Sequence, residues 1–107
     1  MGDTHKNVSI TLSNLGSICL ESGEYEEALL FFQEKLEIIN SDNEEEVAAI
    51  YNFIGVTYCF LNQYDEALKA FEDSYELLSQ KLDKTNPKLV KLVKDIEKLK
   101  KKQRNQN

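Results

Sequence analysis

An internal repeat of 39 residues is the feature that most constrains what this chain can fold into. Shifting the sequence against itself by that period aligns Gly16 with Gly55, Tyr25 with Tyr64, Glu27 with Glu66, Ala28 with Ala67, Leu29 with Leu68, Phe32 with Phe71 and Glu37 with Glu76. A repeat of this length is typical of an array of identical supersecondary units. The sequence therefore predicts one structural unit that occurs twice.

The apolar positions in each copy predict a pair of helices. In the first helix of the unit, residues spaced by three and four form one stripe, which we expect to be buried. These residues are Leu12, Leu15, Gly16 and Cys19 in the first copy and Tyr51, Ile54, Gly55 and Tyr58 in the second. A second helix starts near Tyr25 or Tyr64 and carries Ala28 and Phe32, or Ala67 and Phe71, on one face. The glycine permits close approach of this helix, so each copy predicts an antiparallel helical hairpin.

Turn and cap residues lie where these hairpins need them. Gly23 and Asn62 follow the first helix of each copy, and both residue types tolerate the positive φ that ends many helices. Ser41, Asp42 and Asn43 offer N-caps to the first helix of the second copy, and Asn86 followed by Pro87 predicts the start of another helix.

A last helix is predicted from about residue 87 to 102. Its apolar face carries Leu89, Leu92, Val93, Ile96 and Leu99. Lys94 replaces the packing glycine and Glu97 the aromatic, so we expect a capping helix that ends the array. The predicted fold is all-α and forms a single domain over residues 1–107. It comprises a first repeat at about 8–40, a second at about 44–82, the capping helix and a basic tail at 100–107.

The two hairpins resemble the tetratricopeptide repeat. The motif L12-x-x-L15-G16-x-x-C19 with A28-x-x-x-F32 matches it once, and Y51-x-x-I54-G55-x-x-Y58 with A67-x-x-x-F71 matches it again in phase. The long period is similar to that of the Pins/LGN-type adaptors. The resemblance implies a short right-handed superhelical array that serves as a scaffold for protein binding. Cys19 departs from the family pattern, which has an aromatic residue there.

The resemblance also implies where a partner binds. In this family the first helices of successive hairpins line a concave groove that accepts a peptide or a partner helix. The corresponding residues here are Ser13, Ser17, Leu20, Asn52, Val56, Phe60, Lys88 and Lys91, with Ile10, Cys59 and Asp95 beside them. The basic, asparagine-rich clamp by which chaperone cochaperones hold a carboxylate tail is missing, so we expect no binding of that tail.

Charge divides the chain into two parts. Residues 1–80 carry three basic and sixteen acidic side chains, a net of −13, whereas residues 81–107 carry ten basic and three acidic ones, a net of +7. Such asymmetry suggests electrostatic contact, either within the molecule, between copies or with an acidic partner. The alternative function is therefore self-association, as a homo-oligomer or domain-swapped fragment of a longer array. Nucleic-acid binding is disfavoured because no aromatic residue is interleaved with the C-terminal lysines.

Catalysis finds no support in the sequence. His5 is the only histidine, lies before the first predicted helix and has no partner by motif. Cys19 and Cys59 lack a metal-type spacing and are interpreted as buried thiols. We expect no catalytic residue, no metal and no cofactor. No apolar run is long enough for a membrane span and no leader pattern is present, so we expect a soluble, cytoplasmic protein without membrane contact.

Overall fold

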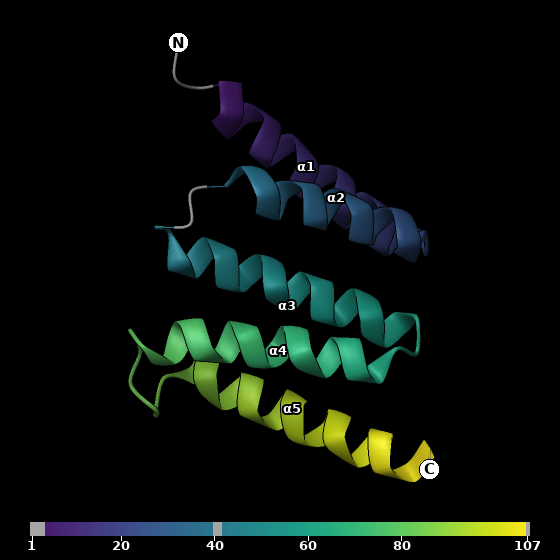
Figure 1. Cartoon of the computed structure of the whole chain (residues 1–107), viewed down its shortest axis with the longest axis vertical. Coiled ribbons are helices and arrows are strands. Elements are labelled where there is room, and N and C mark those ends of the chain that lie inside the picture. The colour runs from purple at the N-terminus through teal and green to yellow at the C-terminus, as the bar shows by residue number, and fades with distance from the viewer. Residues whose placement is uncertain (1–3, 40–41, 107) are drawn as a thin grey trace.

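The chain is all-helical, as the repeat predicts. A computed structural model describes residues 4–39 and 42–106, which contain helices and connecting turns but no strand. The helices are α1 (Thr4–Glu21), α2 (Tyr25–Ile38), α3 (Glu44–Phe60), α4 (Tyr64–Ser79) and α5 (Pro87–Gln106). Each helix packs on the next one in the sequence, so the chain forms a stack with its two ends at opposite extremes (Figure 1). The stack is thin, with extents of 50 × 34 × 18 Å.

Left-handed residues close both hairpins. Gly23 has φ +81° and Asn62 has φ +60°. Directly after them, the Glu24 N–H donates to the Cys19 carbonyl at 2.8 Å and the Gln63 N–H donates to the Tyr58 carbonyl at 2.9 Å. The same chain reversal is thus built twice, once with glycine and once with asparagine, which confirms the two predicted turns.

The glycine of each hairpin lies against the phenylalanine of the same hairpin. A Cβ atom on Gly16 would lie 2.6 Å from Phe32 Cε1, and one on Gly55 would lie 2.9 Å from Phe71 Cε1. Both distances are shorter than van der Waals contact, so only glycine lets the two helices approach this closely. Ala28 and Ala67 are fully buried at the same crossings, which confirms the predicted packing of each hairpin.

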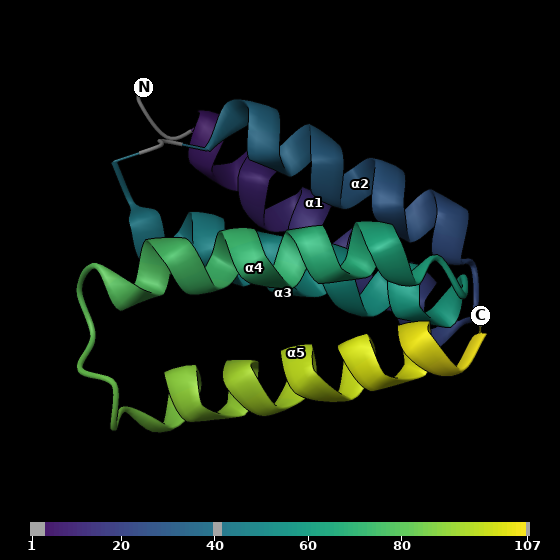
Figure 2. The same ribbon diagram turned by 60° about the horizontal axis from the view of Figure 1, so that its bottom comes forward.

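Two apolar clusters join the helices into one stack. In the first, Ile50 and Ile54 of α3 contact the α2 residues around Ala28 and Phe32. In the second, the buried leucines of α5 (Leu89, Leu92 and Leu99) contact the α4 residues around Ala67 and Phe71. Hence α3 covers α2 and α5 covers α4, and α5 runs along the α3–α4 pair (Figure 2).

Two apolar side chains that were expected to be buried are exposed, and Cys59, also expected to be buried, is only partly buried. Leu15 is 38% exposed and Val93 is 41% exposed. The equivalent of Leu15 is Ile54, which is buried because α2 covers that side of α3, and no described helix covers the same side of α1. α5 packs mainly on α4, so its Leu89, Leu92, Ile96 and Leu99 side chains face inward and Val93 lies exposed beside them.

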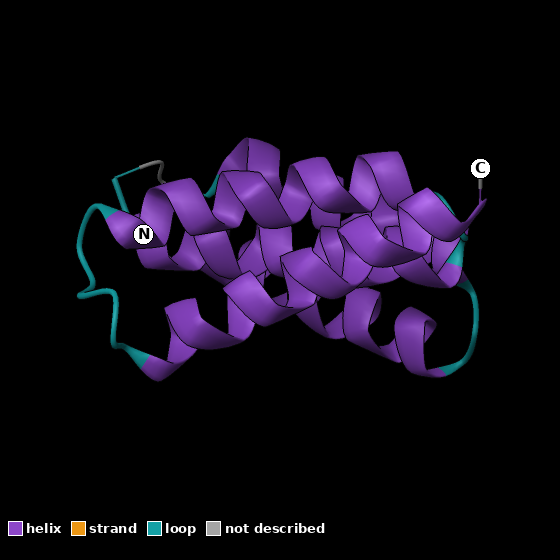
Figure 3. Cartoon of the chain, turned by 90° about the horizontal axis from the view of Figure 1, so that it is seen from below, coloured by secondary structure: helices purple, strands orange, loops and turns teal. Residues whose placement is uncertain are grey.

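Helix ends differ from their predicted positions at both ends of the chain. α1 begins at Thr4, so the backbone of His5 is helical, and α5 continues to Gln106, so residues 100–106 extend the helix instead of forming a separate tail. Helices make up most of the described part of the chain, and short loops and turns connect them (Figure 3). None of the described helices is long and apolar enough to cross a membrane.

Two of the predicted N-caps are confirmed. The Asn43 side chain accepts a hydrogen bond from the Glu46 N–H at 3.2 Å, and the Asn86 side chain accepts one from the Lys88 N–H at 3.0 Å. Both bonds satisfy amides of the first helical turn, which have no partner within the helix. Of the other two candidates before α3, Asp42 precedes the capping residue Asn43, and Ser41 lies outside the described residues.

Candidate functional site

Two stripes of side chains, one on α3 and one on α5, line a groove along the molecule. Residues spaced by three and four lie on one face of a helix. The α3 stripe comprises Glu45, Ala49, Asn52, Val56, Cys59 and Phe60, and the α5 stripe comprises Lys88, Lys91, Asp95, Lys98 and Lys102. All of these residues line one or the other of two adjoining pockets, so the two stripes form the opposite walls of the groove.

The first pocket lies beside the N-terminal halves of α3 and α5. Its volume is about 210 Å³. Apolar contacts come from Ala48, Ala49, Leu78 and Leu92, and the polar lining comprises Glu45, Asn52, Ser74, Lys88, Lys91 and Asp95. The half-buried Asn52 amide makes no side-chain hydrogen bond within the described part of the chain. Its donors and acceptor therefore remain available to a bound backbone.

The second pocket continues the groove toward the C-terminal ends of the same helices. Its volume is about 430 Å³, and it is lined by Val56, Cys59, Phe60, Phe71, Lys91, Asp95, Lys98, Leu99 and Lys102. Lys91 and Asp95 line both pockets, so the groove is continuous. The Phe60 ring is 54% exposed and stacks on Tyr25 of α2 with ring centroids 4.8 Å apart. This stacking holds an exposed apolar surface in a fixed orientation.

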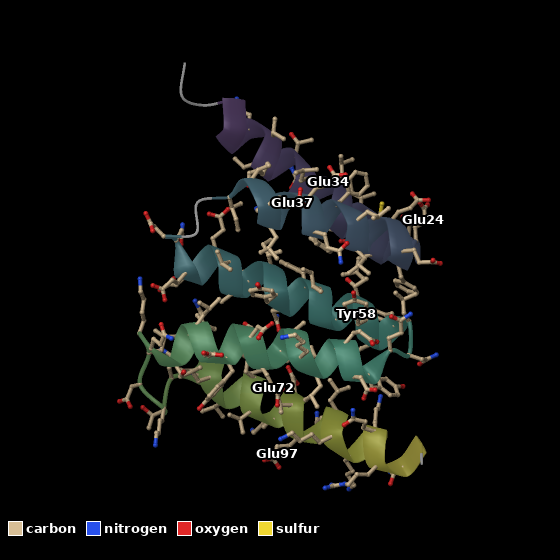
Figure 4. All side chains as sticks on the ribbon, viewed as in Figure 1. Glu24, Glu34, Glu37, Tyr58, Glu72 and Glu97 are labelled. Atoms are coloured by element: carbon tan, nitrogen blue, oxygen red, sulfur yellow. The ribbon has the colours of Figure 1, made fainter. Side chains whose placement is uncertain are left out.

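Lysines dominate the α5 wall. Lys91 Nζ lies 2.9 Å from Asp95 Oδ2 in an ion pair within the helix, and Lys102 Nζ lies 5.8 Å from the Tyr64 ring centroid. Within the described residues, Lys88 and Lys98 form no ion pair. The acidic side chains labelled in Figure 4 lie mostly elsewhere, with Glu24 at the first turn, Glu34 and Glu37 on α2 and Glu72 on α4.

The Cys59 thiol lies in the second pocket, and the surroundings there shift its pKa. Burial raises its pKa above the ordinary value, the charge of Lys102 acts in the opposite direction, and Asp95 raises the pKa further. A thiol with a raised pKa stays protonated and is a weak nucleophile. The groove therefore offers shape, apolar surface and positive charge, and its cysteine is protonated at neutral pH.

The structure brings part of the predicted site together. Asn52, Val56, Phe60, Lys88 and Lys91 all line the groove, with Cys59 and Asp95. The α1 members of the prediction, Ser13, Ser17 and Leu20, line neither pocket.

Packing accounts for two of the α1 residues. Ser13 Oγ accepts a hydrogen bond from the buried Lys35 ammonium, and Leu20 packs against the cluster around Cys19. Ser17 is half-buried on the same helix.

Lys98 and Lys102 line the groove and were missed from the sequence. The basic tail predicted at 100–107 includes Lys102, and Lys98 was not among the predicted groove residues. The spacing 88, 91, 95, 98 and 102 advances by three or four residues at each step, which places these side chains on one helical face. That spacing is a signal present in the sequence, and it becomes useful once the helix is known to continue past residue 100.

A second group of polar side chains lies at the first turn. Ligand-type atoms of Cys19, Glu24 and Glu27 lie within 4.8 Å of one another. The Cys19 pKa is raised by burial and then by the charges of Glu24 and Glu27. A raised pKa keeps the Cys19 thiol protonated at neutral pH when no cation is bound.

Comparison with known proteins agrees with this architecture. The pattern of the tetratricopeptide repeat matches residues 11–46 and, separately, residues 47–87. The chain belongs to the tetratricopeptide repeat family. The second matched segment ends at the first residue of α5, so the rest of this helix lies outside both matches.

A human protein shares part of this tetratricopeptide repeat sequence. The chain is 32% identical over 66 residues to a protein described as "Intraflagellar transport protein 88 homolog" from Homo sapiens. The similar segment covers 62% of this chain and 8% of the human protein. The chain therefore corresponds to a small part of that relative's length.

Proposed function

We propose that this module binds a peptide or helix of a partner protein in the groove between α3 and α5, and that it catalyses no reaction. Tetratricopeptide repeats are protein–protein interaction modules, and two of them make up most of this chain. The observation that carries the proposal is the continuous groove, in which two adjoining pockets are lined by facing stripes of α3 and α5.

The dimensions of the groove suit a short segment. From residue 45 to residue 60 the α3 wall extends roughly 22 Å at about 1.5 Å per helical residue. An extended peptide covers that distance with about seven residues. The apolar pocket surfaces would exclude water from two of its side chains, while Asn52 hydrogen-bonds its backbone. This division between apolar contacts and a few polar groups is typical of binding sites.

The groove residues support binding better than chemistry. Asp95 is held by Lys91 at 2.9 Å, and the pKa of the Cys59 thiol is raised. No histidine is among the described residues that line the two pockets, so neither group has beside it the base that general acid–base or nucleophilic catalysis most often uses. We propose the same non-catalytic role for the module in the cytoplasm. The human relative named for intraflagellar transport is matched over too little of its length for that process to be carried over.

A paired substitution in the groove tests the proposal. We would combine Asn52→Arg with Val56→Glu, which fills the centre of the groove and leaves the net charge unchanged. The control exchanges Lys69 and Glu72 on the exposed face of α4, as Lys69→Glu with Glu72→Lys, and also leaves the net charge unchanged. Both proteins, and the unmodified chain, would be used to capture partners from the source cell under identical conditions.

We expect the groove variant to lose the partners that the unmodified chain and the control retain. Circular dichroism must show the same helix content for all three proteins, so that loss of binding is not loss of fold. If the groove variant retains the same partners, the groove is not the binding site.

A second candidate function, association between copies, is favoured by exposed apolar side chains at both ends of the stack. Leu15 and Ile18 of α1 are 38% and 60% exposed, and Val90 and Val93 of α5 are 39% and 41% exposed. Because these rows lie at opposite ends, contact between α1 of one copy and α5 of the next would bury both and repeat indefinitely. Light scattering that shows a monomer mass at every concentration and salt strength would contradict this candidate.

A further inference from the structure

We infer that the groove selects an acidic segment with apolar anchor residues. The inference rests on the proposed function, because it names the chemistry of the segment that the same groove binds. The α5 wall of the groove carries most of its positive charge, the α3 wall carries apolar surface, and the inference follows from this difference. The occupant is a stretch of polypeptide whose carboxylates face α5 and whose apolar side chains enter the two pockets.

The α5 wall supplies the charge. Four lysines, at positions 88, 91, 98 and 102, line the two pockets, whereas Glu45 and Asp95 are their only acidic lining residues. Lys91 is neutralised by Asp95, but Lys88 and Lys98 have no carboxylate partner among the described residues, and Lys102 lies over an aromatic ring. Carboxylates on a bound segment would supply these missing partners. The chain before residue 81 has a net charge of −13, so this wall differs in sign from most of the molecule.

The α3 wall and the pocket floors supply apolar surface. Past Glu45, the α3 stripe contains no charged residue and ends in Val56, Cys59 and the exposed Phe60 ring. The pocket volumes of about 210 and 430 Å³ are several times the share of one water molecule, about 30 Å³, so each can hold a side chain. A segment that carried only charge would leave both pockets unfilled.

The same features argue against a nucleic acid as the occupant. Nucleic acids bind through phosphate contacts together with stacking of bases on aromatic side chains. The α5 wall has no aromatic residue, and among the described lining residues Phe60 offers the one exposed ring, too few for successive bases to stack. The strongly acidic remainder of the chain would also repel an extended phosphate backbone. Apolar anchors that fill the pockets are available to a peptide and unavailable to a sugar–phosphate chain.

Matched lysine variants of α5 provide the test. The groove variant carries Lys88→Gln, Lys98→Gln and Lys102→Gln. The control variant carries Lys94→Gln, Lys100→Gln and Lys101→Gln, which lie on the same helix, are exposed and line neither pocket. Both variants lose three positive charges. A difference in peptide affinity between them therefore results from the positions of the lysines and not from the net charge. A library of random 12-residue peptides displayed on phage would be selected on the unmodified chain, and the enriched peptides synthesised with a fluorescent label.

We expect the enriched peptides to carry a net negative charge and at least two apolar residues. Their affinity, measured by fluorescence anisotropy, should fall about tenfold for the groove variant, because each exposed ion pair contributes roughly a two- to threefold change. The control variant should bind within about twofold of the unmodified chain, since exposed charges away from the contact act weakly through solvent. Circular dichroism would confirm that all three proteins remain helical.

Other outcomes separate the two proposals. Neutral or basic peptides that are lost with Asn52→Arg and Val56→Glu would preserve the binding groove and overturn its selection of acidic segments. Peptides that tolerate every groove substitution would overturn both. Equal loss of affinity in the two lysine variants, displacement of the peptides by a thymidine oligonucleotide, or failure to enrich any peptide would each overturn the acidic-segment inference.

Discussion

The two hairpins have the same internal packing but are covered differently. Ile54 in the second hairpin is 6% exposed, whereas its equivalent Leu15 in the first is 38% exposed. One helix turn further on, Thr57 is fully buried and its equivalent Ile18 is 60% exposed. The comparison shows that a residue of the repeat motif is buried by two partners, its own hairpin and the hairpin before it. The motif residues that the two hairpins share predict only the contacts within each hairpin, and they do not show whether another hairpin lies before it.

A buried polar position also differs between the hairpins. Ser74 of α4 donates from Oγ to the Ala48 carbonyl of α3 at 2.8 Å. At the equivalent position α2 carries Lys35, whose ammonium donates to Ser13 Oγ of α1 and lies 3.4 Å from Glu46 Oε1 of α3. The serine joins the two helices of one hairpin, whereas the lysine also reaches the next hairpin. Lys35 thus couples the two repeats through charge at a place where Ser74 acts only locally.

The largest expected effect comes from truncating the equivalent apolar positions. We predict that Ile54→Ala lowers the free energy of unfolding by about 2–5 kcal/mol, as is typical when a buried aliphatic side chain leaves a cavity. Leu15→Ala should cost under about 1 kcal/mol, because much of its side chain already contacts water. Urea denaturation followed by circular dichroism measures both. Equal losses for the two variants would show that α1 is covered in solution.

A smaller effect is expected from the coupling between repeats. We predict that Glu46→Gln lowers the free energy of unfolding by about 1–2 kcal/mol, because it removes the negative charge that pairs with the buried Lys35 ammonium. Lys35→Met should cost less than Glu46→Gln, because it removes the buried charge and retains an apolar chain of similar length.

Ser74→Ala is the matched change in the second hairpin. It removes one neutral hydrogen bond, for which we expect a loss of about 0.5–1.5 kcal/mol. The same urea titrations would rank the three variants. A Lys35→Met protein less stable than the Glu46→Gln protein would contradict the coupling that we describe.

The fold could be predicted from the sequence because its determinants are local. Gly16 and Phe32 lie within one hairpin, as do Gly55 and Phe71, and their spacing is visible in the sequence. The turn residues Gly23 and Asn62 are equally local. The residues that identify each hairpin in the sequence are also the ones that contact one another in it, so the repeated pattern is enough to predict the hairpins.

The site could be predicted only in part, because it depends on how each helix is rotated against its neighbours. The register of the repeat predicted a groove with Asn52, Val56 and Ser13 in it, and in the structure Asn52 and Val56 line pockets with the α5 lysines whereas Ser13 contacts Lys35. Val93 was expected to be buried by the same register and is exposed, because α5 packs mainly on α4 whereas α3 packs on both α2 and α4. Rotation of this kind follows from the neighbours that are present, which the motif does not encode.

The smallest predicted effect concerns the two turns. Glu24 and Glu27 lie at the first turn, and a hydrogen bond with Glu24, followed by the charge of that residue, raises the Glu27 pKa above its ordinary value of 4.5. The second hairpin has Gln63 in place of Glu24. A carboxyl group whose folded-state pKa is raised adds stability below its unfolded pKa, and this contribution is lost as the pH rises through the folded pKa. The first turn is therefore less favourable at pH 7 than at pH 4.

Glu24→Gln, which copies the second turn into the first, should remove this dependence. We expect the variant to melt at a higher temperature than the unmodified chain at pH 7, with the difference shrinking as the pH falls below about 4.5, where Glu27 is protonated in both proteins. Thermal melts at a series of pH values measure it, with Glu66→Gln at the second turn as the matched removal of one charge. If Glu66→Gln raises the melting temperature at pH 7 by as much as Glu24→Gln does, the gain comes from reducing the net negative charge of the chain, and the two turns do not differ.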